Sequence, residues 1–223
     1  MAEKEQMPAV RLETELGGPY ASPPEPLPFA PSLHVRAFLL RRDPGNLLLY
    51  SVTGLSAAEP AIEALGGVER QYLNHWHEAM FASDRLAAPL FVHEADRDQV
   101  AERTSVSGTF ADRHTLDRDF EVVPIPGHTS GATAYLWETG EQRVLFTGDT
   151  IYLSKGEWVA AVLESSDRAA YIGSLELIRD LEFDVLVPWA ATAGEPYYAL
   201  TSMDDSRRRL DAILERVRHG AAR

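Results

Sequence analysis

Residues 126–149 read PGHTSGATAYLWETGEQRVLFTGD, and this stretch says most about how the chain folds. An apolar run leads into the proline–glycine pair and ends at His128, a pattern typical of a tight loop that leaves a strand. The residues that follow predict a β-hairpin that turns at residues 139–140. The second strand of this hairpin ends at a glycine, and Asp149 follows immediately. The stretch therefore predicts a histidine and an aspartate, each presented at the end of a strand.

A second group of candidate ligands lies upstream, in the sequence LNHWHEAM. The run before it predicts a strand that reaches His75 and His77. Because alternate residues of a strand point to the same side, both imidazoles could meet one metal ion, with Trp76 pointing into the opposite layer. Each group also has a structural explanation, since a His-x-His pair can be one packed and one surface residue. Equally, His128 could be a turn residue without a role, and Asp149 could cap a turn or the next helix.

Composition limits the possible functions of the chain. Its 223 residues, 45% hydrophobic and 25% charged, are typical of a soluble globular protein with one domain or at most two small ones. The formal net charge of −13 argues against nucleic acid and anionic membrane as partners. The chain has no cysteine, so any metal must be held by histidine and carboxylate. No apolar run is long enough to span a membrane, and the first residues lack the apolar core of a secretory signal, so a cytoplasmic location is expected.

Three segments are expected along the chain. Residues 1–31 are rich in proline and predict an extended arm. Residues 32–200 alternate strand-like and helical patterns and predict an α/β domain with its helices outside. Residues 201–223 predict a C-terminal helix packed on the same domain, beginning near Ser202 with Asp205 as its capping partner.

Taken together, the His-x-His pair, the PGHTSG motif and the FTGDT motif resemble the metallo-β-lactamase superfamily, especially its glyoxalase II-like hydrolases. The resemblance covers roughly residues 33–190. It implies an αββα sandwich, in which two mixed β-sheets carry helices on both outer faces. It also implies that the functional site lies at one edge of the two sheets.

The resemblance implies one retained metal site. The family's first ion is held by three histidines, and the matching positions are His75, His77 and His128. Asp149 matches the carboxylate that lies between the two ions of the family. One divalent ion is therefore expected, with zinc as the first choice and iron as the alternative. Side chains that could line the mouth of such a site are Tyr152, Lys155, Tyr197 and Tyr198.

The ligand positions of the family's second ion have changed. The family pattern is His-x-His-x-Asp-His, and its last two positions are Ala79 and Met80 in this chain. A further family histidine follows an apolar strand and a proline, where this chain has Ala190, or Trp189 in a shifted register. Glu78 is adjacent to the pair, but strand alternation should turn it away from the two histidines. These changes predict a degenerate second-metal site.

Three functions are compatible with this ligand set. The first is hydrolysis of a small ester or thioester by water that a single ion activates, with no side chain assigned as general base. The second is a non-catalytic binding protein, in which apolar side chains occupy the second-metal position. The third follows from the persulfide dioxygenases of the same superfamily, whose single iron would correspond to His75, His128 and Asp149. A small-molecule substrate is expected, and the oligomeric state is left open.

Overall fold

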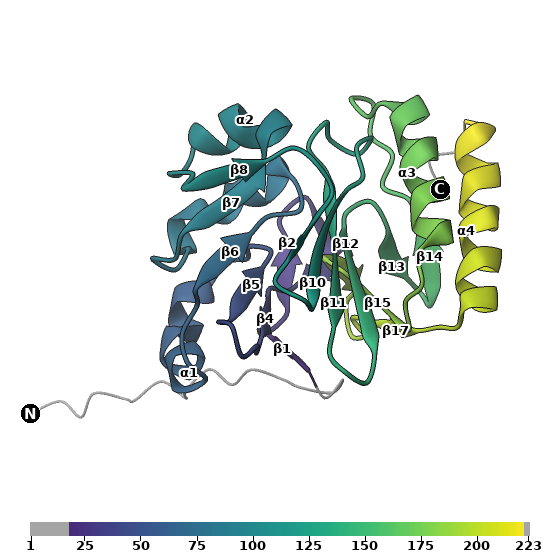
Figure 1. Cartoon of the computed structure of the whole chain (residues 1–223). Coiled ribbons are helices and arrows are strands. Elements are labelled where there is room, and N and C mark those ends of the chain that lie inside the picture. The colour runs from purple at the N-terminus through teal and green to yellow at the C-terminus, as the bar shows by residue number, and fades with distance from the viewer. Residues whose placement is uncertain (1–17, 221–223) are drawn as a thin grey trace, which may run out of the picture.

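The computed structural model describes residues 18–220 and places the strands in the middle of the molecule, with helices on both outer sides (Figure 1). The helices on one side are α1 (Glu59–Ala64) and α2 (Arg97–Ala101), and those on the other are α3 (Arg168–Asp180) and α4 (Met203–Arg218). Short 3-10 helices are η1 (Leu55–Ala58), η2 (Trp76–Asp84) and η3 (Glu94–Asp96). The expected α/β sandwich is therefore confirmed.

The strands pair into three sheets, one more than expected. The six-stranded first sheet has the order β1 (Pro19–Ala21), β4 (Phe38–Leu40), β5 (Leu47–Leu49), β6 (Arg70–Tyr72), β7 (Leu90–His93), β8 (Gly108–Phe110). The six-stranded second sheet has the order β17 (Ala199–Leu200), β15 (Val185–Pro188), β12 (Arg143–Gly148), β11 (Thr133–Glu138), β10 (Phe120–Pro124), β9 (His114–Leu116). The five-stranded third sheet has the order β14 (Glu157–Val159), β13 (Tyr152–Ser154), β16 (Ala190–Thr192), β3 (Ala30–Val35), β2 (Glu25–Leu27). Trp189 alone separates β15 from β16, so the chain passes directly from the second sheet to the third.

Aromatic side chains fill the space between the first and second sheets. The ring of Phe38 in β4 lies 5.7 Å from that of Phe146 in β12, measured between centroids. Likewise, the ring of Tyr72 in β6 lies 5.5 Å from that of Tyr135 in β11. All four side chains are buried, and such tilted ring pairs add to the free energy gained from burial. This packing holds the two sheets against each other.

The segment expected to form an arm contributes strands. Residues 1–17 lie outside the described part of the chain. From residue 19 onwards, β1 pairs with β4 of the first sheet, and β2 and β3 extend the third sheet through the pairing of β3 with β16. The prolines fit because short, irregular strand edges do not need every backbone N–H.

The last helix begins as its sequence predicts. The Ser202 hydroxyl accepts a hydrogen bond from the backbone N–H of Asp205, which caps α4. Its buried side chains include Leu210, Ile213, Leu214 and Val217. The helix lies against α3, and the ion pairs Arg179–Asp211 and Arg218–Glu176 join the two on their exposed sides.

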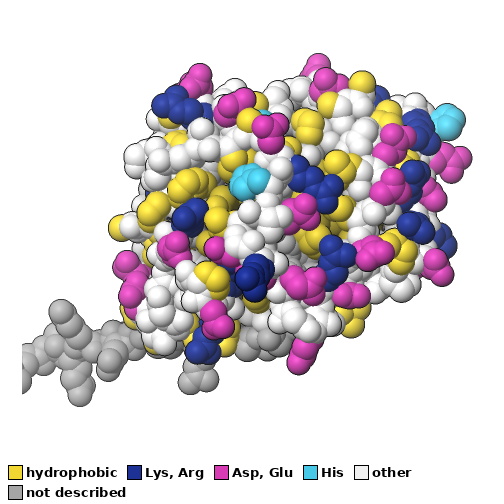
Figure 2. Space-filling model, viewed as in Figure 1, with side chains coloured by type: hydrophobic (Ala, Val, Ile, Leu, Met, Phe, Trp, Pro, Cys, Tyr) yellow, Lys and Arg dark blue, Asp and Glu magenta, His cyan; other side chains and the backbone are white. Residues whose placement is uncertain are grey.

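Charged side chains of both signs are mixed over the face of the molecule that Figure 2 shows. Within residues 18–220, every helix is too short or too polar to cross a bilayer.

A buried arginine joins the turn between β4 and β5 to the turn before β10. The Arg42 side chain is 1% exposed and donates from Nε and Nη2 to the two carboxylate oxygens of Asp119, at 2.8 and 2.6 Å. It also donates from Nη2 to Asp117, at 2.8 Å. The Arg42 guanidinium holds the pKa of the Asp119 carboxyl below its ordinary value. The buried cation is thus neutralised by two carboxylates that remain partly exposed.

We expect Asp119→Asn to lower the free energy of unfolding at pH 7 by about 1–3 kcal/mol, because Arg42 loses a charged partner. The folded-state pKa of Asp119 lies below its unfolded value, so its contribution is complete above pH 3.8 and is lost as the pH falls through the folded pKa. The difference between variant and parent should therefore shrink towards pH 3 in urea titrations. Asp112→Asn, at an exposed position, is the control. A constant difference from pH 7 to pH 3 would contradict this account.

Candidate metal centre

The two histidines of the His-x-His pair lie at the start of a 3-10 helix, so the strand predicted there is wrong. Strand β6 ends at Tyr72, and His75 is the extended residue that precedes η2. The two imidazoles nevertheless face the same place, with ring centroids 5.0 Å apart. The helical turn, and not the alternation of a strand, brings them together.

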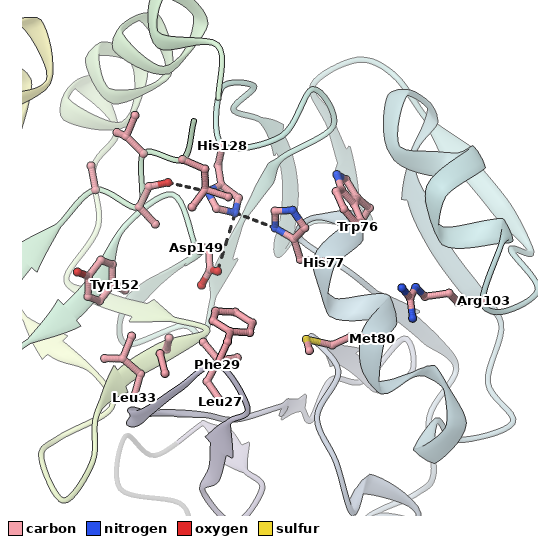
Figure 3. Close-up of a pocket in the computed structure, with 16 residues that line it drawn as sticks. Leu27, Phe29, Leu33, Trp76, His77, Met80, Arg103, His128, Asp149 and Tyr152 are labelled. Atoms are coloured by element: carbon pink, nitrogen blue, oxygen red, sulfur yellow. Dashed lines mark hydrogen bonds and ion pairs between the residues drawn. The ribbon is translucent and has the colours of Figure 1, made fainter. Parts of the chain in front are cut away.

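The structure brings the predicted ligand residues into one cluster, of which Figure 3 shows His77, His128 and Asp149. One nitrogen of each of His75, His77 and His128 lies within 4.8 Å of the other two. Nδ1 of His77 is 3.2 Å from Nε2 of His128. Oδ2 of Asp149 is 3.6 Å from Nε2 of His75 and 3.9 Å from Nε2 of His128. The histidine pair follows β6 of the first sheet, while the other two residues follow β10 and β12 of the second.

Hydrogen bonds to the outer nitrogens orient two of the rings. Nδ1 of His75 lies 2.9 Å from Oδ1 of Asn74 and 3.3 Å from Oε1 of Glu78. Nδ1 of His128 lies 2.7 Å from the carbonyl oxygen of Ala161. Because all three neighbours accept hydrogen bonds, the proton of each ring sits on Nδ1 and the lone pair of Nε2 faces the cluster. Nε2 of His75 is buried and makes no hydrogen bond to any described residue.

These donors fit a divalent ion. Two ligand atoms about 2.1 Å from zinc at a tetrahedral angle are about 3.4 Å apart, close to the observed 3.2, 3.6 and 3.9 Å. Burial lowers the pKa of His77 to about 4 and lowers the pKa of His75 and of His128, so the imidazoles are neutral, as ligation requires. Burial raises the pKa of Asp149 to about 7, and a cation beside it would reverse this.

Glu78 lies behind the site. Its carboxylate is buried and accepts hydrogen bonds from the backbone N–H groups of Asn74, His75 and Ser51, at 2.7, 3.2 and 2.9 Å. Burial raises the pKa of Glu78 well above its ordinary value, which the three N–H groups partly offset. The Glu78 side chain is turned away from the cavity, as expected. The cause is the 3-10 helix together with these hydrogen bonds, and not the alternation of a strand.

Asp96 is a functional candidate that sequence reasoning missed. Its buried carboxylate accepts from the N–H of Trp76 at 3.0 Å, the hydroxyl of Thr129 at 2.7 Å and the N–H of Gly131 at 2.8 Å. It therefore ties the loop of the histidine pair to the loop of His128. The available signal was its place at the end of an apolar strand, in FVHEAD.

Close packing explains two of the motif glycines. Gly127 has a φ of +140°, and a Cβ there would lie 2.4 Å from Cα of Tyr171. Gly148 has a φ of +56°, and a Cβ there would lie 1.9 Å from Cγ of Asn74. Any side chain at either position would displace the neighbouring ligand residue.

The positions matched to the second ion carry no ligand groups. Met80 and Ala190 line the cavity, whereas Ala79 is buried in a small apolar cluster with Leu73 and neighbouring strand residues. Trp189 packs behind His75, with ring centroids 5.4 Å apart, so Ala190 is the residue of that pair that faces the cavity. Met80 is 36% exposed.

Of the other residues that the sequence singled out, some line the cavity and some lie outside it. Trp76 lines the cavity with its ring 4.1 Å from that of His77, so its expected place in the core is wrong. Tyr152 also lines the cavity. The other three residues expected at the mouth of the site do not line the cavity: Lys155, Tyr197 and Tyr198.

Comparison with known proteins agrees with the fold. The sequence profile described as the metallo-beta-lactamase superfamily matches residues 54–190. Similar solved structures include the metallo-β-lactamase GOB-18 from Elizabethkingia meningoseptica, at 16% identity, covering 98% of this chain and 97% of that one, with a TM-score of 0.64. A metallo-β-lactamase from Pontibacter korlensis has 15% identity, 94% and 99% coverage and a TM-score of 0.69. The family protein TTHA1429 from Thermus thermophilus has 19% identity, 92% and 81% coverage and a TM-score of 0.63. At these identities the likeness shows the fold alone, and no curated protein sequence matches the chain.

We expect Asp96→Asn to weaken zinc binding about 10- to 100-fold, because the amide cannot accept from all three donors that join the two ligand loops. Competition with a chromophoric chelator measures the dissociation constant. The control is Asp98→Asn, whose side chain is 90% exposed. Equal zinc affinity in both variants would show that Asp96 does not position the ligands.

We expect Gly148→Ala to cost about 2 kcal/mol or more beyond the cost of Gly156→Ala. Both glycines have a positive φ, +56° and +79°, but a Cβ at Gly156 would meet nothing within 4 Å. Comparing the two variants therefore separates the cost of steric overlap with Asn74 from the cost of backbone strain, which both variants share. Urea unfolding curves measure the two costs, and equal values would contradict the packing argument.

Proposed function

The chain belongs to the metallo-β-lactamase superfamily, and on this basis we propose that it is a hydrolase with a single divalent ion, zinc, held by His75, His77, His128 and Asp149. The observation that carries the proposal is the buried Nε2 of His75. This atom makes no hydrogen bond to any described residue and faces Asp149, 3.6 Å away, and the two other imidazoles. An unpaired buried acceptor costs free energy unless something binds it, and a cation would do so.

A single ion is proposed because the cavity offers no second set of ligands. Among the described residues that line it, the only ligand-type side chains are His77, His128 and Asp149, which already belong to the first set. Met80 and Ala190 occupy the places matched to the second set and offer at most a weak thioether ligand.

Each part of the site has a distinct proposed task. A bound zinc ion would supply a Lewis acid and a water molecule with a pKa near 7. Asn74 and Glu78 fix the His75 ring so that Nε2 faces inward, and the Ala161 carbonyl does the same for His128. The one carboxylate in the cavity lining, among the described residues, is Asp149, and no separate side chain is assigned as general base.

A small ester or thioester is the proposed substrate, in keeping with the glyoxalase II-like motifs. The second candidate function is a metal-binding module without catalysis, and the loss of ligand groups at Met80 and Ala190 is the observation that favours it. An iron oxygenase with two histidines ranks lower, because Nδ1 of His77 lies only 3.2 Å from Nε2 of His128 and would take a position that oxygen needs.

We expect the full chain, purified without a tag or added metal, to contain one zinc per chain by elemental analysis. We expect His128→Ala to lose that zinc and to lose hydrolysis of a test thioester, because one of three imidazole ligands is removed. His219→Ala, at an exposed position in the last helix cap, is the control and should keep both. Unchanged zinc content in His128→Ala would refute the site. Bound zinc with no hydrolysis would favour the binding module, and iron would favour the oxygenase.

A further inference from the structure

The cavity beside the ligand cluster has two chemically different sides. Its volume is about 700 Å³, which suits an organic ligand of moderate size. One side carries His77, His128 and Asp149. Most of the remaining lining is apolar, and we call these side chains the apolar wall: Leu27, Phe29, Leu33, Met80, Val162 and Leu163. Figure 3 shows Leu27, Phe29, Leu33 and Met80 across the cavity from His128, whereas Val162 and Leu163 follow Ala161, whose carbonyl lies against the His128 ring.

Part of the apolar wall is exposed to solvent. Phe29 is 71% exposed, Leu163 is 43% exposed and Met80 is 36% exposed. The other large apolar side chain with comparable exposure, among residues 18–220, is Leu200 at 63%, and it lies outside the cavity. Clustered apolar surface of this kind marks a place where something binds. Because it lines the same cavity as the ligand cluster, its occupant would reach the candidate ion.

The wall offers few partners for a polar ligand. Apart from the ligand cluster, the one charged residue in the lining is Arg103, which makes no ion pair with any described residue. It lies beyond Met80, away from the histidines (Figure 3). A sugar or a multiply charged group placed here would leave polar atoms without hydrogen bonds, at a cost in free energy.

We propose that this site takes esters or thioesters whose acyl group is an apolar chain, lying along the apolar wall towards Phe29 and Leu163. This inference rests on the proposed hydrolysis and adds the class of acyl group to it. The ester carbonyl would lie at the ligand cluster, and water would replace the thiol or alcohol at the carbonyl carbon. The products would be the carboxylic acid and the free thiol or alcohol. Arg103 would accommodate a single anionic group at the far end of the substrate.

Binding is tested with ligands that are not hydrolysed. The N-methyl amides of acetic, butanoic, hexanoic and octanoic acid are titrated into the full chain as purified, with calorimetric detection. The dissociation constant should fall about threefold to fourfold for each added methylene. A dissociation constant that does not change with chain length would overturn the proposal.

Substitutions of exposed residues in the apolar wall test where the acyl chain of the ligand binds. Phe29→Ser and Leu163→Ser should each weaken binding of the octanoyl amide about fivefold to tenfold, with little effect on the acetyl amide. Their exposure makes both substitutions compatible with folding. Leu200→Ser is the control, because it removes an exposed leucine that lies outside the cavity. Equal binding by all three variants would overturn the assignment. So would a dimer that dissociates in Phe29→Ser, since a second copy would then cover the wall.

Thioesters of the same acids separate this inference from the proposed function. Binding of the amides with chain-length dependence, but no hydrolysis of any thioester, would refute the hydrolase and retain the apolar ligand. Hydrolysis with the same kcat/KM for acetyl and octanoyl thioesters would retain the hydrolase and refute the acyl-chain site. A kcat/KM that rises with chain length, and falls in Phe29→Ser for the octanoyl thioester only, is the expected result.

Discussion

The side chain of Asn74 joins the segments on which the candidate metal centre depends. Its amide nitrogen donates to the backbone carbonyls of Thr133 and Thr147 in the second sheet, and its amide oxygen faces Nδ1 of His75. An amide suits this place because it supplies two donors and an acceptor in one plane. Gly148 packs against it so closely that a single methyl group would not fit. The positions of the ligand groups relative to one another therefore depend on the contact between the first and second sheets at Asn74.

Two buried carboxylates complete the support of the ligand loops. These loops lie outside the sheets, so their backbone N–H groups need other acceptors. Glu78 takes two of these N–H groups and that of Ser51, and Asp96 takes two more together with a hydroxyl. A buried carboxylate costs several kcal/mol, which only such multiple hydrogen bonds offset. The loops gain fixed positions that strand pairing does not give them.

Sequence reasoning succeeded where the cause is local. The turn residues around His128 and Asp149 and the cap at Ser202 act within a few positions, so their placement could be predicted from the pattern. The 3-10 helix at His75 was missed although Glu78 accepts the nearby N–H groups of Asn74 and His75, because the apolar run before it favoured a strand. The N–H of Ser51, from another part of the chain, adds a third bond that no local pattern indicates. The same holds for the N-terminal strands β2 and β3, which reach the third sheet through β16, near the other end of the chain. A proline-rich run gives no local sign of that distant partner.

The ligand groups and half of the apolar wall come from different parts of the fold. The first and second sheets present the candidate ligands, and all four lie within the family match of residues 54–190. Leu27, Phe29 and Leu33 come from the third sheet and its turn, and they precede that match. Half of the apolar wall is therefore encoded in a stretch that holds none of the candidate ligands, while Met80, Val162 and Leu163 lie within the family match. In the proposed hydrolase, substitutions in residues 27–33 would therefore change which acyl group fits and leave every candidate ligand in place.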